Sequence, residues 1–274
     1  MNGPSMREAI LDGGLLVPHH QTDAEWSVIE AALGKALQRP ALFLSASVPK
    51  DRPRGEHEHE FIPDDVRQDF RSDWDLLPAA LMHRSPRNIR RAVSWIAREA
   101  LARDYLLVFG GHPAISPMVL DIAERVVPSD DEIRVLVFQA RIFKNAMTEA
   151  AIDLARWRHG CMVLTQPPSG DPADTRQRVP ALSRMRAEMT ALPNLTAAVF
   201  VGGMSGLLEE SMRFAERHPG TPRYAVGSTG GAAQFLLERR PDQHSGNRTA
   251  GLLTALTSDP SYGALAVRIF DDLG

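Results

Sequence analysis

Short apolar runs alternate with amphipathic helical patterns from Ala41 onward, and this alternation constrains the fold more than any other feature of the chain. It is typical of parallel strands joined by crossover helices, because strands that are covered on both faces are hydrophobic along their whole length. We therefore predict an α/β fold with a doubly wound parallel sheet, Rossmann-like in its architecture. Six strands are expected, at residues 41–45, 105–109, 133–138, 161–164, 197–201 and 224–226.

The pattern predicts a single nucleotide-binding domain over residues 41–274, preceded by a helical extension over residues 1–40. In the extension, Trp26, Ile29 and Ala32 are spaced for one face of a helix. A helix is expected before the second strand, where Ser85 can cap it and Pro86 suits its first turn. Polar, proline-bearing loops are predicted at 48–65 and 166–178, both directly after strands.

Charge and composition exclude several functional classes. The formal net charge is -3 and the pI about 6.3, so no global positive field favours nucleic acid as a partner. The single cysteine, Cys161, lies in an apolar run and has no disulfide partner, which indicates a reducing compartment. No apolar stretch approaches the length of a membrane span, so we expect a cytoplasmic protein without a membrane partner.

Four of the predicted strands end in clusters of small residues. Glycine lets backbone N–H groups approach a ligand, and a helix that starts just afterwards directs its positive end at a bound anion. Tight turns and close helix packing would explain any one cluster, but the four together favour a phosphate-binding pocket. The clusters are Ser45-Ala46-Ser47, Gly110-Gly111-His112, Gly202-Gly203-Met204-Ser205-Gly206 and Gly227-Ser228-Thr229-Gly230-Gly231.

Standard cofactor and catalytic motifs are missing from these turns. No strand is followed by a Walker lysine, and neither glycine cluster has the spacing of the dinucleotide fingerprint, so we expect no cofactor. Leu207 replaces the second glycine of a nucleophile elbow around Ser205, which argues against a hydrolase serine. His57 and His59 alternate along the chain without a third ligand on their side, so no metal site is predicted.

Three segments resemble the SLOG superfamily, which includes the Lonely Guy cytokinin-activating enzymes and the DNA-processing protein Smf/DprA. They are residues 43–47, 108–117 and 201–209. In the third segment, Gly202, Gly203 and Glu209 match the Pro-Gly-Gly-x-Gly-Thr-x-x-Glu motif of Lonely Guy enzymes, whereas Val201, Ser205 and Gly206 replace its proline, later glycine and threonine. Upstream, Arg186 and Met189 are similar to the Arg-Lys-x-x-Met stretch of those enzymes, with Met185 where arginine is expected.

The resemblance implies a Rossmann-like fold whose glycine loop holds a nucleotide phosphate. Members outside the enzyme branch are thought to sense nucleotide-derived signals such as ADP-ribose derivatives, often in bacterial stress or phage defence, and this chain is closer to that branch. A sensor that binds ADP-ribose or a cyclic ADP-ribose-like molecule is therefore the first hypothesis. The alternative is a nucleoside 5′-monophosphate phosphoribohydrolase with Glu209 as its catalytic carboxylate.

Side chains near the predicted pocket have both ligand-binding and purely structural interpretations. Arg184 and Arg186 can clamp a phosphate or form a solvated helix face, and His112 can donate to a phosphate or bond to local backbone. Glu209 can accept from a ribose hydroxyl or serve the first turn of a helix. A homodimer is implied by the resemblance alone. A DNA-binding protein of the Smf/DprA kind remains the third hypothesis, which the net charge does not favour.

Overall fold

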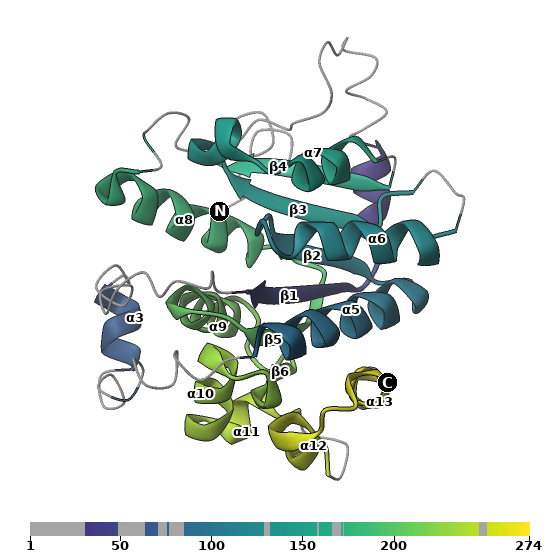
Figure 1. Ribbon diagram of the computed structural model, residues 1–274, viewed down its shortest axis with the longest axis vertical. Helices are drawn as coiled ribbons and strands as arrows, with labels where there is room; N and C mark the ends of the chain where they lie inside the picture. The colour runs from purple at the N-terminus through teal and green to yellow at the C-terminus, as the bar shows by residue number, and fades with distance from the viewer. Residues whose placement is uncertain are drawn as a thin grey trace.

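A computed structural model describes residues 31–48, 64–70, 76, 85–128, 132–157, 159–165, 171, 173–246 and 251–274 of the chain. Six parallel strands form one sheet in the order β4-β3-β2-β1-β5-β6, from top to bottom in Figure 1. The predicted α/β fold with a parallel, Rossmann-like sheet is thus confirmed. The strands are β1 (Ala41–Ser47), β2 (Leu106–Gly110), β3 (Val135–Ala140), β4 (Gly160–Thr165), β5 (Leu195–Gly202) and β6 (Arg223–Val226).

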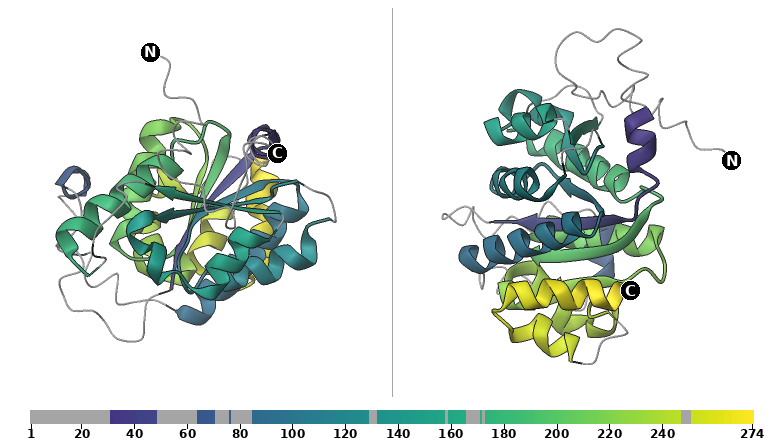
Figure 2. Two further views of the ribbon diagram at one scale, coloured as in Figure 1. Left: turned by 90° about the horizontal axis from the view of Figure 1, so that it is seen from above. Right: turned by 90° about the vertical axis from the view of Figure 1, so that its right-hand side faces the viewer.

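Helices cover both faces of the sheet, as Figure 2 shows in its left view. On one face α7, α6, α5 and α13 pack side by side, and on the other α8, α9 and α10 do so. Residues 31–36 are also helical. The helices are α3 (Asp64–Asp69), α5 (Pro86–Ala102), α6 (Ser116–Val126), α7 (Glu149–Arg156), α8 (Thr175–Met189), α9 (Ser205–Arg217), α10 (Gly231–Arg239), α11 (Pro241–His244), α12 (Leu252–Ser258) and α13 (Tyr262–Leu273), with 3-10 turns η3 (Arg141–Ala146) and η4 (Gly227–Thr229).

Helix α5 begins where the sequence predicts. The Ser85 hydroxyl accepts from the backbone N–H of Asn88 at 3.3 Å, and Pro86 occupies the first turn. Apolar residues spaced along one face of the helix, including Ile89 and Val93, are fully buried against the sheet. The capping serine and the apolar stripe therefore fix both the start and the orientation of this helix.

The connections of the sheet change direction beside β1. The chain steps from β1 outward to β4, then crosses to β5 and continues to β6 on the other side of β1. In register, Ser47 at the end of β1 pairs with Gly202 at the end of β5. This edge is the topological switch point, where ligands of open α/β sheets bind.

Several predicted boundaries differ from the structure by one or a few residues, and two of these differences affect the site. β3 runs two residues beyond the predicted end at residue 138, because Gln139 and Ala140 still pair with Leu164 and Thr165 of β4. Helix α8 begins at Thr175 with Asp174 as its capping residue, so the end of the predicted 166–178 loop is helical. Residues 49–63 of the other predicted loop, His57 and His59 included, lie outside the described residues, as do Trp26 and Ile29.

Cys161 is buried in β4, as predicted, and burial raises the pKa of its thiol to about 12. It is therefore a protonated core side chain. Leu33 and Ala36, in the region predicted to be an N-terminal extension, are buried in the same hydrophobic core as the sheet. None of the helices in the described part of the chain is long and apolar enough to span a membrane.

Candidate functional site

A cavity of about 630 Å³ lies between helix α8, the start of α9 and the carboxyl ends of β1, β2 and β3. Three of the four predicted strand ends reach it, and α8 and η3 complete its wall. Its volume is typical of sites for nucleotide-sized ligands. The predicted site residues that line it are Ser45, Ala46, Ser47, Gly110, Gly111, His112, Arg186, Met204, Ser205, Gly206 and Glu209.

The fourth strand end packs beside the switch point and is not part of the described cavity lining. The Thr229 hydroxyl accepts from the N–H of Gly202 at 2.8 Å and donates to the carbonyl of Val226 at 2.6 Å. Nearby, the N–H of Ala232 donates to the carbonyl of Gly203 at 3.3 Å. These bonds tie the turn after β6 to the turn after β5. The predicted residues Gly202, Gly203, Gly227, Ser228, Thr229 and Gly230 do not line the described cavity, and three of them, Gly202, Gly203 and Thr229, take part in these bonds.

The two predicted arginines of α8 differ in position. Arg186 lines the cavity, and only 16% of its side chain is exposed. Arg184 does not line it; 63% of its side chain is exposed, and its Nε donates to Glu188 at 2.5 Å. The phosphate clamp predicted for both arginines is therefore compatible with the position of Arg186 alone.

The N-terminus of α9 opens on the cavity without a side-chain cap. Met204 is the capping residue, and its side chain makes no capping hydrogen bond. Ser205 and Gly206 follow in the first turn, and both line the cavity. An uncapped helix start places backbone N–H groups and the positive end of the helix dipole where an anion can bind.

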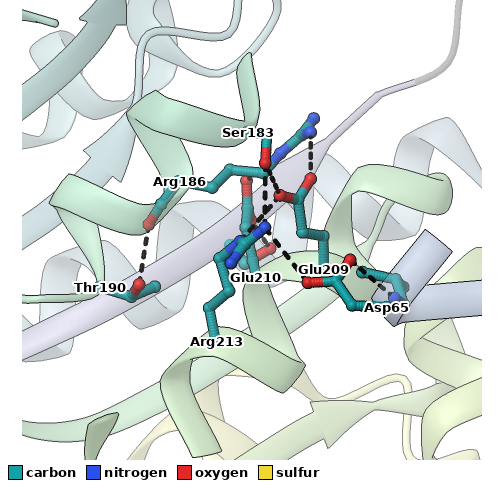
Figure 3. A network of polar contacts seen from close by, with 9 residues as sticks. Asp65, Ser183, Arg186, Thr190, Glu209, Glu210 and Arg213 are labelled. Atoms are coloured by element: carbon teal, nitrogen blue, oxygen red, sulfur yellow. Dashed lines mark hydrogen bonds and ion pairs between the residues drawn. The ribbon is translucent and has the colours of Figure 1, made fainter. Parts of the chain in front are cut away.

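Glu209 is held at the centre of a charged network, with only 1% of its side chain exposed (Figure 3). Arg186 Nη1 donates to one carboxylate oxygen at 2.7 Å, and Arg213 Nε donates to the other at 2.8 Å. The Ser183 hydroxyl donates to that second oxygen at 2.5 Å. Arg213 also lies 3.7 Å from Asp65 of α3, so the network reaches from α8 through α9 to α3.

Glu210, the next residue, has a different environment. Its carboxylate bonds to the hydroxyl of Ser45 and lies 3.4 Å from Arg186 Nε, and the residue lines the cavity. Burial raises its pKa, an effect that the negative charge of Glu209 reinforces and that Arg186 and Ser45 oppose. For Glu209 burial also acts to raise the pKa, but Arg186, Ser183 and Arg213 together lower it below its ordinary value. The neighbouring carboxyls are therefore shifted in opposite directions.

His112 follows the two glycines after β2. Its Nδ1 accepts the N–H of Ala114 at 3.1 Å, so the neutral ring carries its proton on Nε2. Its carbonyl accepts from the backbone N–H groups of Ile115 and Ser116, which begin α6. The predicted bond to local backbone is therefore present at Nδ1, and His112 also lines the cavity.

Several lining residues were missed by the sequence analysis. Arg178 of α8 lines the cavity, and no side chain in the described ranges forms an ion pair with it. Gln139 and Phe143 line the same cavity from β3 and η3. The detectable signal was the spacing of Arg178, Leu182, Met185 and Arg186 on one helix face, which the predicted loop obscured.

Within the part of the chain that the structure describes, no cluster of three or more histidine, cysteine, aspartate or glutamate side chains has the arrangement of a metal site. Comparison with known protein families finds a match to the SLOG cluster3 family over residues 84–250, which is more than half of the chain. The match begins just before α5 and includes strands β2 to β6. No curated protein matches the sequence.

Proposed function

Since this chain belongs to the SLOG cluster3 family, we propose that its cavity binds a nucleotide-derived small molecule, of the ADP-ribose or cyclic ADP-ribose type, and that the protein is a sensor. The observation that carries this proposal is a cavity with one end lined by backbone, a helix start and a guanidinium, and with an apolar end. Ser47, Gly206 and Arg186 lie at the first end, and Phe143 and Leu182 at the second. A nucleotide has the same division between its phosphate and its base.

The phosphate would lie at the start of α9. Ser205 and Gly206 offer backbone N–H groups there, and Arg186 offers a guanidinium. Arg186 is already paired with Glu209, so Arg178 supplies the charge that the protein itself does not neutralise. The two arginines are eight residues apart on one face of α8, a separation of about 12 Å in an α-helix. This spacing suits a ligand with more than one anionic or polar group along its length.

Glu209 favours binding over cleavage. A catalytic carboxyl has to exchange a proton or hold a ribose hydroxyl near neutral pH. Both oxygens of Glu209 already accept hydrogen bonds from Arg186, Arg213 and Ser183, and its lowered pKa keeps it ionised. Its role in this proposal is to hold Arg186 in the cavity wall.

One observation supports the alternative of a phosphoribohydrolase. Glu210 lines the cavity with a raised pKa, which is the property of a carboxyl that can donate a proton. Cleavage of an N-glycosidic bond by this enzyme would therefore depend on Glu210 as well as on the network around Glu209. Replacement of Glu210 by glutamine would then abolish release of the free base while leaving nucleotide binding intact.

The cellular role is inferred from family resemblance. We propose a cytoplasmic signalling protein, active in bacterial stress or phage defence, that works as a homodimer. Sedimentation of the purified protein tests the dimer, and a single monomeric species would contradict it.

A nucleotide panel tests binding and turnover together. Purified protein is incubated with AMP, ADP-ribose, cyclic ADP-ribose isomers and NAD, and melting shifts are recorded while products are followed by chromatography. Stabilisation with intact ligand is the expected result, because a ligand that binds only the folded state raises its stability. Free base with ribose 5-phosphate would favour the hydrolase, and no shift with any nucleotide would refute the cavity as a nucleotide site.

A further inference from the structure

Gln139, near the end of β3, is a largely buried residue whose amide has no hydrogen-bond partner among the described residues. Only 8% of the residue is exposed, and it lines the cavity. Among the residues that the structure describes, no backbone or side-chain group hydrogen-bonds to this amide. Most polar side chains in a protein interior have a protein partner for their donors and acceptors, whereas this amide opens on the cavity instead. An amide left open toward a cavity is therefore suited to a ligand.

Gly111 leaves room for this amide. A Cβ atom at residue 111 would lie 2.5 Å from Gln139 Oε1 and 3.3 Å from Val137 Cγ1. The absence of a side chain at Gly111 thus makes the space in which the amide lies. Gly111 is itself held by its N–H, which donates to the carbonyl of Phe138 at 2.7 Å.

The surroundings of Gln139 in the cavity are mostly apolar. Phe143 and Met147 line this region from η3 and the residue after it, and Leu182 and Met185 line it from α8. Phe143 is half-buried, and no other ring within the described ranges stacks on it. An aromatic side chain beside a single polar amide is the arrangement that binds a flat heterocycle by its face and reads it by its edge.

The distance between Gln139 and the start of α9 is comparable to the length of a nucleotide. β3 and β5 are separated by β2 and β1 in the sheet, so their ends lie on the order of 14 Å apart at the usual strand spacing. Gln139 belongs to β3, and the turn into α9 follows β5. A phosphate at the start of α9 would place the base of the same molecule toward β3.

We propose that Gln139 recognises the base of the bound nucleotide, through an edge on which a hydrogen-bond donor lies beside an acceptor, as on adenine. This inference rests on the proposed function and adds the identity of the recognised edge. A glutamine amide has one acceptor and a donor side by side, so it forms two hydrogen bonds with the amino group and ring nitrogen of adenine. A base without the amino group leaves one of these bonds unmade.

The test compares ligands first on the unmodified protein. Affinities for AMP, purine riboside 5′-monophosphate and ribose 5-phosphate are measured by calorimetry. The purine riboside nucleotide lacks only the amino group of AMP, and ribose 5-phosphate lacks the whole base. AMP is expected to bind about tenfold more tightly than the purine riboside nucleotide, because one lost hydrogen bond in a buried site costs roughly 1.4 kcal/mol.

Variants then assign this preference to Gln139. Gln139→Met keeps the length of the side chain and removes both hydrogen bonds, so it should abolish the tenfold preference while leaving the affinity for ribose 5-phosphate unchanged. Gly111→Ala should weaken the preference as well, since the added methyl group displaces the amide. Gln234→Met is the matched control, because the amide of Gln234 donates to Glu238 at 2.6 Å and does not line the cavity.

The outcomes separate this inference from the proposed function. Equal affinity of the unmodified protein for AMP and the purine riboside nucleotide would overturn the inference, whatever the variants do. A tenfold preference that persists in a folded Gln139→Met protein would also overturn it, while nucleotide binding itself stands. Failure of AMP, ADP-ribose and ribose 5-phosphate to bind would instead overturn the proposed function, and the inference with it.

Discussion

Replacing Glu209 by glutamine should destabilise the protein strongly, although the side chain keeps its size. The carboxylate pairs with both Arg186 and Arg213 in a buried site, where its own side chain is 1% exposed. Removing one partner of a buried ion pair typically costs about 3–5 kcal/mol, because the remaining charges stay desolvated. For a domain of this size, such a loss lowers the melting temperature by on the order of 10 °C.

Urea unfolding of the Glu209→Gln variant measures this cost. Repeating the measurement at several pH values tests whether the ionised carboxylate is its source. The pKa of Glu209 is lowered in the folded protein, so the carboxylate stabilises the fold above its unfolded pKa of about 4.3. That stabilisation disappears as the pH falls through the lowered folded pKa. The free-energy difference between variant and wild type should therefore be largest near pH 7 and should shrink at about pH 3.

Glu216→Gln is the matched control. Glu216 lies on the same helix, is exposed, and has no ion-pair partner among the described residues. Its replacement should change the free energy of unfolding by less than about 0.5 kcal/mol. A Glu209→Gln variant that loses less than about 1 kcal/mol at pH 7 would refute the view that Glu209 anchors both arginines.

Three further outcomes follow from the structure. Arg178→Met should weaken nucleotide binding about tenfold or more in calorimetry without lowering the melting temperature, whereas Arg184→Met should leave affinity unchanged; the opposite result would place the ligand outside the cavity. Gly206→Ala places a Cβ 2.3 Å from Arg186 Nη2, so it should cost about 1–3 kcal/mol of stability by urea unfolding, and a wild-type value would mean that the guanidinium is loosely held. Burial, reinforced by nearby Arg223 and Arg240, lowers the pKa of His244 to about 4, so the free energy of unfolding should fall by roughly 3 kcal/mol as the pH drops from 6.5 to 4. A His244→Gln variant should lack this loss, and a variant whose stability depends on pH as the wild type does would refute the assignment to His244.

The sequence predicted the sheet well because its strands are short and buried on both faces. Apolar runs such as residues 197–201 have no competing helical period, and β5 contains that whole run. The end of β3 was missed because Gln139 is polar, and a polar residue ends an apolar run in the sequence. In the structure the backbone ladder continues through Gln139, which pairs with Leu164, and its side chain faces the cavity. The strand thus continues through a polar residue that lines the cavity.

The start of helix α8 was also missed, because its sequence resembles that of a loop. Its first turn is polar and directly follows a proline-bearing segment, so this turn was assigned to the loop at 166–178. Consequently Arg178 was missed, and Arg184 was grouped with Arg186 by proximity in sequence. On a helix, residues two apart face different directions, whereas residues eight apart share a face. If the helix had been predicted to begin at Thr175, Arg178 and Arg186 would have been assigned to the same helix face.

Three of the four small-residue strand ends contain glycine, and these glycines have two different physical causes. At Gly111 and Gly206 a Cβ would meet the side chains of Gln139 and Arg186, both of which line the cavity. At Gly231, where φ is +66°, a Cβ would instead lie 2.6 Å from the carbonyl of Gly203, because two turns of the backbone pass close together. The first kind of glycine makes room for a side chain that lines the cavity, and the second lets two turns pack closely. The sequence shows only that each residue is small. The structure shows which neighbour lies where a Cβ would be, and that neighbour distinguishes a glycine beside the cavity from one between two packed turns.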